Sequence, residues 1–350
     1  MKILLVKLSS LGDVVHTLPV VQDIRAAFPD AMIDWVVEKS FAPVLRHSEG
    51  LVRIIACEIR RWRKSPFSAQ TRSAWRAFKA ELQAEAYDAV IDLQGLTKSA
   101  LVARLARLAP EGKRYAMANG TEGSGYEAAT RWVADVAIPV PFHVHAVRRG
   151  RLLGAAALGY QPAEKISYGL TVPKAEGGDG ATVLLVHGTS RQDKEWPATH
   201  WADLGRRLVG AGFHVALAHG NDGELSASQG TAADIVGATG RPGCAEVWPR
   251  LSLDALTARM ARCAGVIGVD SGLSHIAVAL DLAHVQIYNF DTAWRTGPLP
   301  HQEEDGGHAQ ASVFAQPAPS VEAVWSAWQA CHAYQSGRVL AAATHEQVLP

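Results

Sequence analysis

The sequence predicts an α/β protein with two doubly wound, Rossmann-like domains that face each other across a central cleft. Short runs of β-branched residues and leucine alternate with amphipathic stretches, which is the pattern of βαβ units and parallel sheets. A length of 350 residues exceeds one ordinary core and suits two domains of about 150 residues each. The alternation also stops once near the middle of the chain and then restarts.

The first half of the chain carries the first series of elements. We predict strands at 2–8, 32–37, 52–55 and 88–92, because apolar and β-branched residues concentrate there. Amphipathic spacing predicts helices at 14–27, 68–86 and 96–108. The N-terminal domain is therefore expected to span residues 1–165.

The second series follows a predicted linker at 166–180, "ISYGLTVPKAEGGDG", which loses periodicity and ends in a Gly/Asp cluster. Strands are predicted at 181–187, 213–219, 264–270 and 284–288, and helices at 198–210, 253–263 and 272–281. The C-terminal domain is expected at 181–319. Residues 320–350 add a helix near 320–334 and a tail, a segment that could pack back on the N-terminal domain.

Composition argues against several classes of protein. The formal net charge is zero, whereas a nucleic-acid-binding protein is usually basic overall. Cys57, Cys244, Cys263 and Cys331 form no C-x-x-C pair, so we expect buried thiols in a reducing compartment. The sequence has no signal-peptide pattern, and no apolar run approaches the ~20 residues that span a bilayer. We expect a cytoplasmic protein.

The usual nucleotide and metal fingerprints are missing. No G-x-G-x-x-G follows a strand, and Gly112–Lys113 lacks the upstream glycine and the hydroxyl residue of a Walker loop. The D-x-D pair that often holds a metal on a nucleotide-sugar is absent, as is H-E-x-x-H. We therefore predict no cofactor and no metal, and expect backbone amides and cations to hold any bound diphosphate.

The first candidate loop for a diphosphate is "HGTSRQDKEWP", 187–197, which directly follows a predicted strand. Thr189 and Ser190 offer hydroxyls, and Lys194 brings an ammonium group to a phosphate. Open α/β sheets bind ligands beyond the carboxyl ends of their strands, where this loop lies. An ordinary polar loop, with Pro197 in the first turn of the next helix, explains the same residues.

The second candidate loop is "GVDSGLSH", 268–275, again between a strand and a helix. Ser271 and Gly272 would present free amides at a helix N-terminus, where the dipole favours an anion. His275 falls one turn later, and the alternative is that Asp270 or Ser271 only caps the helix. Two such loops on neighbouring strands favour a diphosphate site. Between them, Glu224 either accepts hydrogen bonds from ribose hydroxyls or is a solvated residue at a helix start.

A basic stretch in the first half contains a dense cluster of cations. Arg60, Arg61, Arg63 and Lys64 surround Trp62 and precede Pro66, and we interpret this segment as non-helical. In a chain without net charge, the cluster favours an anionic substrate or a membrane headgroup region. Nucleic acid is a weaker alternative, since one short patch supplies few phosphate contacts.

Asp13 lies in "VKLSSLGDVVHTLP", 6–19, where a strand pattern gives way to a helix pattern. An aspartate at this position is usually a helix cap, and the residues alone favour that role. However, Ser9 and Ser10 are also available as caps, and Asp13 follows the end of a strand, where doubly wound domains hold their sites. His16, one turn later, either positions a polar group or packs in the helix.

Taken together, six segments resemble the lipopolysaccharide heptosyltransferases of glycosyltransferase family 9. They are "VKLSSLGDVVHTLP", "IDWVVE" (33–38), "IRRWRK" (59–64), "YDAVIDLQGLTKSA" (87–100), "DKEWP" (193–197) and "VDSGLSH" (269–275). The resemblance runs from residue 1 to about 334. It implies a GT-B fold and metal-independent, inverting transfer of heptose from ADP-L-glycero-β-D-manno-heptose. The implied acceptor is the first Kdo of Kdo2-lipid A, on the cytoplasmic face of the inner membrane, to which the protein would bind peripherally.

The resemblance also implies roles for individual residues. Asp13 would be the general base, which reverses the preference for a cap. The donor site would comprise Thr189, Ser190, Lys194, Glu224, Leu251, Asp270, Ser271, Gly272 and His275. The acceptor would meet Arg60, Arg61, Arg63, Lys64 and Lys98. The family's usual "YGPTDP" is replaced here by "YNFDTAW", 288–294, to which we assign no role.

The sequence is also compatible with three alternative functions. Another member of the same family could act on a later position of the lipopolysaccharide core. A GT-B-like nucleotide-sugar epimerase would not need the basic cluster. A nucleotide-sugar-binding module would bind the donor without turnover.

Overall fold

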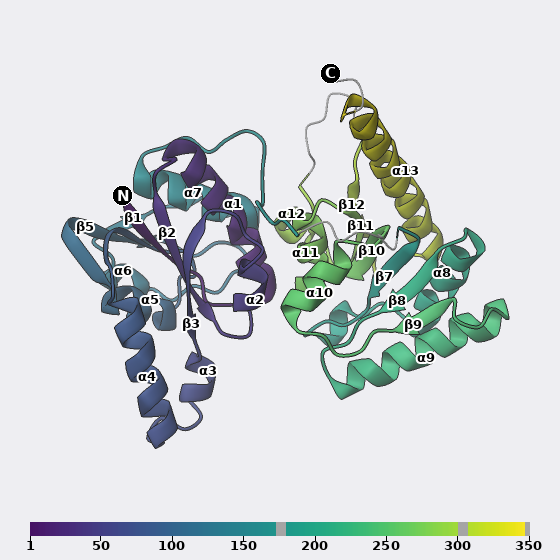
Figure 1. The fold of residues 1–350 in the computed structure, drawn as a ribbon, viewed down its shortest axis with the longest axis horizontal. Coiled ribbons are helices and arrows are strands. Elements are labelled where there is room, and N and C mark those ends of the chain that lie inside the picture. The colour runs from purple at the N-terminus through teal and green to yellow at the C-terminus, as the bar shows by residue number, and fades with distance from the viewer. Residues whose placement is uncertain (173–179, 300–306, 347–350) are drawn as a thin grey trace. The chain divides into compact units, whose positions relative to one another are not determined.

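The computed structural model describes residues 1–172, 180–299 and 307–346 (Figure 1). The chain divides into two compact units, Met1–Thr171 and Val172–Pro350, and each is described by itself. Residues 173–179 of the predicted linker and 347–350 of the predicted tail lie outside the described residues.

The first unit is a six-stranded parallel sheet with strand order β3-β2-β1-β4-β5-β6. Its elements are β1 (Lys2–Val6), α1 (Leu11–Ala27), β2 (Met32–Glu38), α2 (Ala42–Leu45), β3 (Leu51–Cys57), α3 (Ile59–Trp62), α4 (Ala69–Leu82), β4 (Ala86–Asp92), α5 (Thr97–Leu105), β5 (Arg107–Met117), α6 (Thr130–Val133), β6 (Val136–Ile138) and α7 (Ala146–Leu158).

Several sequence-based predictions in this unit differ from the structure; for example, the helix predicted at 68–86 ends at Leu82. The helix predicted at 96–108 ends at Leu105, because Arg107 already pairs with Ala86 at the start of β5. The basic cluster is not wholly non-helical, since Ile59–Trp62 forms the single turn α3 and Arg63 is its C-cap. A helix of one turn is too short to leave a periodic signal in the sequence.

The strand β1 is buried on both faces, as expected for a central parallel strand. Leu4 and Val6 belong to the core cluster that also contains Phe78 of α4 and Val102 of α5. Elsewhere in this unit α1 packs on α7, where Arg151 binds Asp23 through two buried hydrogen bonds of 2.6 and 2.8 Å.

The second unit is another six-stranded parallel sheet, with order β12-β11-β10-β7-β8-β9. Its elements are β7 (Thr182–Val186), the 3-10 turn η1 (Gln192–Lys194), α8 (Ala198–Gly210), β8 (His214–Leu217), α9 (Asp222–Thr239), β9 (Ala245–Val247), α10 (Leu253–Met260), β10 (Gly265–Val269), α11 (Gly272–Ala279), β11 (Ala283–Tyr288), α12 (Ala293–Thr296), β12 (Gln310–Phe314) and α13 (Val321–Glu346).

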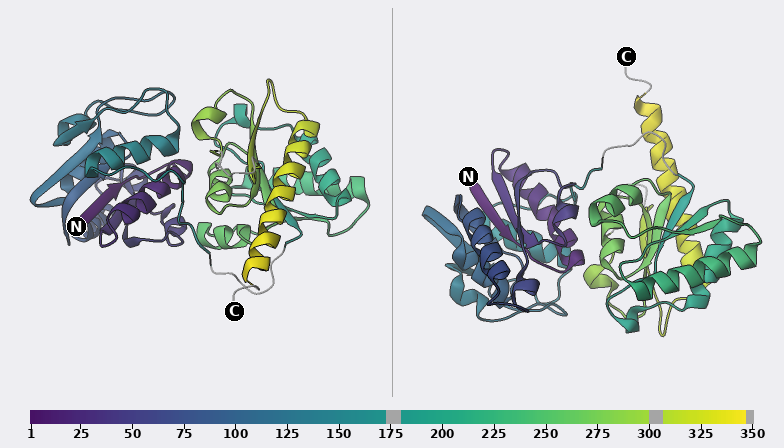
Figure 2. Two further views of the ribbon diagram at one scale, coloured as in Figure 1. Left: turned by 90° about the horizontal axis from the view of Figure 1, so that it is seen from above. Right: turned by 60° about the horizontal axis from the view of Figure 1, so that its bottom comes forward.

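The last helix, α13, packs against β11 and α8 of the second unit (Figures 1 and 2). It is longer than the predicted 320–334. Val324, Trp328 and Cys331 place their side chains in the core of this unit, which explains why the helix is held on the sheet. The four cysteines are free and buried, as predicted. Among the described helices, none combines the length and the hydrophobicity of a membrane-spanning segment.

Both sheets have the same topology when each is counted from its own first strand. The chain winds outward through β1, β2 and β3, then crosses to β4 on the other side of β1. The second unit repeats this with β7, β8 and β9, followed by β10 beside β7. In such sheets the ligand site lies at the carboxyl ends of the strands where the order reverses. The prediction of two Rossmann-like domains is confirmed, and it directs attention to the loops after β1, β4, β7 and β10.

Candidate active-site residues at the two sheet switch points

Asp13 lies in the first turn of α1, just beyond the carboxyl end of β1. Its Oδ2 accepts hydrogen bonds from the backbone N–H of Ser10 (3.0 Å) and from the Ser10 hydroxyl (2.9 Å). The backbone bond is half of a capping box, so the capping role predicted from the residues is present. However, 35% of the side-chain surface remains exposed. A carboxylate that only capped the helix would not need two cations as well.

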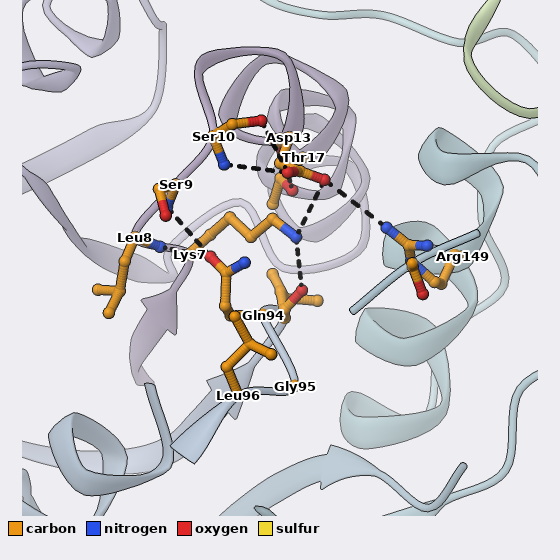
Figure 3. Close-up of polar contacts among 12 residues, drawn as sticks. Lys7, Leu8, Ser9, Ser10, Asp13, Thr17, Gln94, Gly95, Leu96 and Arg149 are labelled. Carbon is orange, nitrogen blue, oxygen red and sulfur yellow. Dashed lines mark hydrogen bonds and ion pairs between the residues drawn. The ribbon is translucent and has the colours of Figure 1, made fainter. Parts of the chain in front are cut away.

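Two cations face the same carboxylate oxygen. Lys7 Nζ lies 3.7 Å and Arg149 Nη2 lies 3.8 Å from Asp13 Oδ1, and Figure 3 shows both side chains directed at it. Burial favours the neutral acid, but the charge of Lys7, the hydrogen bonds from Ser10 and the charge of His16 outweigh it. Together they hold the pKa of Asp13 below its ordinary value. The carboxylate is therefore ionised and accessible.

Lys7 is an unusual neighbour because it is itself buried, with 3% of its surface exposed. Burial lowers the pKa of Lys7, whereas the nearby carboxylates of Asp13 and Asp92 raise it. Its ammonium also donates to the carbonyl of Leu93 at 3.0 Å, beyond the end of β4. Lys7 thus joins the ends of the two strands at which the sheet order reverses.

The side chain of Gln94 completes this link. Its Oε1 accepts the backbone N–H groups of Leu8 and Ser9, both at 3.1 Å (Figure 3). The N–H of Gln94 in turn donates to Asp92 Oδ1 at 2.9 Å. Burial raises the pKa of Asp92 to about 6, against hydrogen bonds from Gln94, Gly95 and Ser99. These contacts fix the loop that carries Ser9, Ser10 and Asp13.

The predicted acceptor cations divide into two groups. Lys98, at the start of α5, donates to Ser9 Oγ at 2.9 Å, so it does reach the Asp13 loop. The cluster on and after α3 is exposed: Arg61 pairs with Glu58 at 2.9 Å, and the Arg60 guanidinium lies 5.8 Å from the Phe41 ring centroid. Arg63 and Lys64 have no ion-pair partner among the described residues. His16 lies edge-on to His145, with ring centroids 6.0 Å apart.

In the second unit, the two predicted loops meet at the ends of neighbouring strands, since β7 pairs with β10. Lys194 Nζ lies 2.5 Å from Asp270 Oδ2, and His275 Nε2 lies 3.4 Å from Asp270 Oδ1. Burial favours the neutral acid here too, yet His275 and Lys194 lower the pKa of Asp270. Only 7% of the Asp270 side chain is exposed. Its carboxylate is occupied by the protein, and its effect is to fix the position of the Lys194 ammonium.

The hydroxyl residues of this site have free donors and acceptors. The side chains of Thr189 and Ser190 make no hydrogen bond to the described residues, and both are at least partly exposed. Ser271 is the N-cap of α11, followed by Gly272, and its buried hydroxyl has no partner within the described chain. The N-terminus of α11 and the loop after β7 therefore present unsatisfied hydroxyl groups at the edge of the sheet where a ligand is expected.

Glu224 lies in the first turn of α9, as the helix-start alternative expects, and it also lies beside the loop after β7. Its backbone N–H donates to Asn221 Oδ1 (2.9 Å), and its carboxylate accepts from Gly220 N (2.7 Å) and Asn221 Nδ2 (2.8 Å), as in a capping arrangement. A Cβ on Gly188 would lie 2.8 Å from Glu224 Cδ. The missing side chain of Gly188 therefore leaves the space that the Glu224 carboxylate takes beside the loop after β7. Leu251 is partly buried and directly precedes Ser252, the N-cap of α10.

Four residues contribute to these sites without having been predicted from the sequence. Lys7 lies in the segment 6–19 and Gln94 in the segment 87–100, whereas Arg149 comes from α7 and has no local signal. The fourth is Asn289, in the segment 288–294. Its Nδ2 donates to the carbonyls of Asp193 (3.2 Å) and Glu195 (2.8 Å), on either side of Lys194. This segment therefore braces the loop that carries the Lys194 ammonium.

Comparison with known proteins gives the family. The sequence pattern of glycosyltransferase family 9 (heptosyltransferase) matches residues 75–313. Lipopolysaccharide heptosyltransferase 1 of Escherichia coli K12 is 38% identical over 295 residues, which cover 82% of this chain and 88% of the relative. The chain belongs to glycosyltransferase family 9, the heptosyltransferases.

Solved structures of the family agree with this assignment. The E. coli heptosyltransferase WaaC with ADP is 32% identical, with a TM-score of 0.80 over 93% of this chain and 98% of that one. WaaC with ADP-2-deoxy-2-fluoro heptose is 31% identical, with a TM-score of 0.74 over 97% and 100% of the two chains. This heptosyltransferase accordingly has the GT-B fold, and it is a glycosyltransferase.

Proposed function

We propose that this heptosyltransferase moves L-glycero-D-manno-heptose from ADP-heptose to the first Kdo of Kdo2-lipid A, with inversion and without a metal ion. The observation that carries the proposal is Asp13: an ionised, accessible carboxylate at the switch point of the first sheet. The relative named lipopolysaccharide heptosyltransferase 1, which this chain covers over most of its length, supports the choice of reaction.

In this proposal Asp13 is the general base. Inverting transfer is an in-line displacement, in which the acceptor hydroxyl loses its proton as its oxygen attacks the anomeric carbon. A carboxylate near that oxygen contributes roughly 10²–10⁴-fold. Because Lys7 and the hydrogen bonds from Ser10 lower the pKa of Asp13, the carboxylate stays deprotonated, and so available as a base, at physiological pH. If a carboxylate of the bound acceptor attracted Lys7 and Arg149 away from Asp13, the pKa of Asp13 would rise. Asp13 would then be a stronger base in the complex with the acceptor.

The donor is assigned to the second unit. Lys194 and the N-terminus of α11 offer positive charge to the diphosphate and stabilise the negative charge that ADP gains as it leaves. The free hydroxyls of Thr189 and Ser190 add hydrogen bonds, and Glu224 accepts from the ribose. Structures of WaaC with ADP and with an ADP-heptose analogue support this class of donor.

The acceptor is assigned to the first unit. The exposed cations Arg60, Arg61, Arg63 and Lys64 suit phosphates and carboxylates, and Lys98 extends this charge to the loop of Asp13. The same cluster would hold the protein peripherally on the anionic cytoplasmic face of the inner membrane, where the acceptor is available.

The test is transfer by the purified full chain with ADP-heptose and Kdo2-lipid A in the presence of EDTA. We expect ADP release and a gain of one heptose in the mass of the product. ADP-heptose binding without transfer would exclude this acceptor and favour a later core position. Loss of transfer in EDTA, restored by a divalent cation, would overturn the metal-free mechanism. Epimerised ADP-sugar in place of transfer would indicate the epimerase alternative.

A further inference from the structure

The first unit contains a pocket of about 790 Å³ that none of the proposed catalytic steps uses. One wall comes from α3, the connection after it and the first turns of α4, and the other comes from the start of α5. Pockets for small ligands usually measure about 300–1,000 Å³. This one is therefore large enough for a substantial part of a ligand.

The lining is largely aromatic and aliphatic. Trp62 and Trp75 meet edge to face with ring centroids 5.4 Å apart, and Phe78 packs behind both at 5.4 and 5.8 Å. Trp62 is buried, whereas Trp75 is 37% exposed. Across the pocket, Leu101 of α5 is 58% exposed. Large apolar side chains on two facing elements are typical of a surface that an apolar ligand covers.

Cations surround this apolar surface. Arg63 has no ion-pair partner among the described residues, and Arg72 donates to a backbone carbonyl, that of Phe67, at 2.7 Å. The carboxylate of Glu127 also lines the pocket, but it accepts from the backbone N–H of Thr97 (2.7 Å) and from its hydroxyl. Positive charge beside apolar surface matches an amphiphile with a hydrocarbon chain and an anionic headgroup.

One lining residue, Lys98, connects the pocket to the loop of the proposed base. Lys98 lines the pocket, and its ammonium donates to Ser9 Oγ at 2.9 Å. Ser10, the next residue, holds the carboxylate of Asp13. The Lys98 side chain therefore lies between the pocket and the loop of Asp13, where an acceptor hydroxyl is expected.

We propose that this pocket receives an acyl chain of the acceptor glycolipid and so gives the enzyme a preference for acylated acceptors. The inference rests on the proposed function, since it identifies the part of the acceptor that the pocket holds. It assigns Trp75 and Leu101 to the hydrocarbon chain, and Arg63, Arg72 and Lys98 to the anionic groups next to it.

The test compares kcat/KM for Kdo2-lipid A and for its fully deacylated saccharide, in the wild type and in Leu101→Gln. Leu101 is exposed, so the substitution should not disturb folding. We expect Leu101→Gln to lose about tenfold on the acylated acceptor, because one large apolar contact is removed. Its rate on the deacylated saccharide should not change. Leu152→Gln is the matched control on α7, at a 39% exposed leucine outside the pocket, and it should change neither rate.

A binding measurement separates the acceptor from bulk lipid. A fluorescent twelve-carbon fatty acid should bind the wild type, bind Leu101→Gln more weakly, and be displaced by Kdo2-lipid A but not by the deacylated saccharide. If phosphatidylglycerol vesicles displaced the fluorescent fatty acid as effectively as Kdo2-lipid A does, the inference would be overturned. The pocket would then serve general membrane docking. Equal effects of Leu101→Gln on both acceptors would also overturn it. No transfer to either acceptor would remove the proposed function, and the inference with it.

Discussion

The two units place an aspartate at the same edge of the same sheet topology, yet they leave the two carboxylates in different states. Asp13 is 35% exposed and has its cations at 3.7 and 3.8 Å, beyond hydrogen-bond distance. Asp270 is 7% exposed and has the Lys194 ammonium at 2.5 Å. Both have a lowered pKa, so the pKa alone does not separate them.

Exposure and distance do separate the two residues. A substrate can reach the exposed carboxylate of Asp13, which accepts no hydrogen bond from its cations, whereas opening the enclosed ion pair of Asp270 carries a large desolvation cost. The comparison therefore assigns proton transfer to Asp13 and the positioning of a cation to Asp270. The carboxyl ends of the strands can support either role, because the contacts of the following loop, and not the sheet itself, determine the surroundings of each carboxylate.

Asp13→Asn should have the largest effect. The amide keeps the shape and can still accept from Ser10, but it cannot take a proton. We expect kcat to fall by roughly 10²–10⁴-fold, while the Kd for ADP-heptose, measured by calorimetry, is unchanged. Asp30→Asn, at an exposed aspartate just beyond α1, is the control and should behave as the wild type. Wild-type turnover in Asp13→Asn would show that the base is elsewhere.

Lys194→Met should have the next largest effect and tests the other half of the comparison. Without the ammonium, we expect kcat to fall by about 10²-fold, as when a preorganised electrostatic contact is removed, and the donor Kd to rise. Arg206→Met, an exposed cation on α8, is the control. Asp270→Asn should be milder than Lys194→Met, because the charge remains and only its position is lost. If Asp270→Asn instead abolished turnover with donor binding intact, the two aspartates would have to exchange roles.

How much of this arrangement is predictable from sequence depends on how local each contact is. Asp13, Lys194 and Asp270 each lie between a strand and a helix, so their place at the sheet edge follows from neighbouring residues alone. The position of Arg149 beside Asp13 cannot be predicted in this way, since Arg149 comes from α7, far along the chain. Nothing in a local pattern distinguishes it from the adjacent Arg148.

Other details depend on packing that no spacing rule reports. Lys7 follows directly after β1, but its burial became visible only in the folded sheet. The segment 288–294 departs from its family's pattern and yet has a clear use, because Asn289 holds the carbonyls on both sides of Lys194. The short strands β6 and β9 have three residues each, below the length at which alternation can be recognised.

Lys7→Met should have the smallest effect at the pH optimum and the most informative one across pH. Lys7 is the strongest of the charges and hydrogen bonds that lower the pKa of Asp13, although Arg149 and the charge of His16 remain after the substitution. Removing its ammonium therefore raises the pKa of Asp13. Because the base must be deprotonated, activity is present above this pKa and lost below it. The acid limb of the kcat/KM profile should accordingly move to higher pH.

The control for this prediction is Lys2→Met, at the other end of β1, where Lys2 pairs with Glu85. It removes the same charge from the same strand and should leave the acid limb in place. If Lys7→Met instead lowered kcat/KM by the same factor at every pH, Lys7 would only support the fold of the loop through its hydrogen bond to Leu93. A shift of the limb, with the wild-type melting temperature retained, would show that the ammonium sets the basicity of Asp13. Lys194→Met should not shift the acid limb of the kcat/KM profile, since Asp270 transfers no proton. This contrast between the two variants tests the difference between the two switch points most directly.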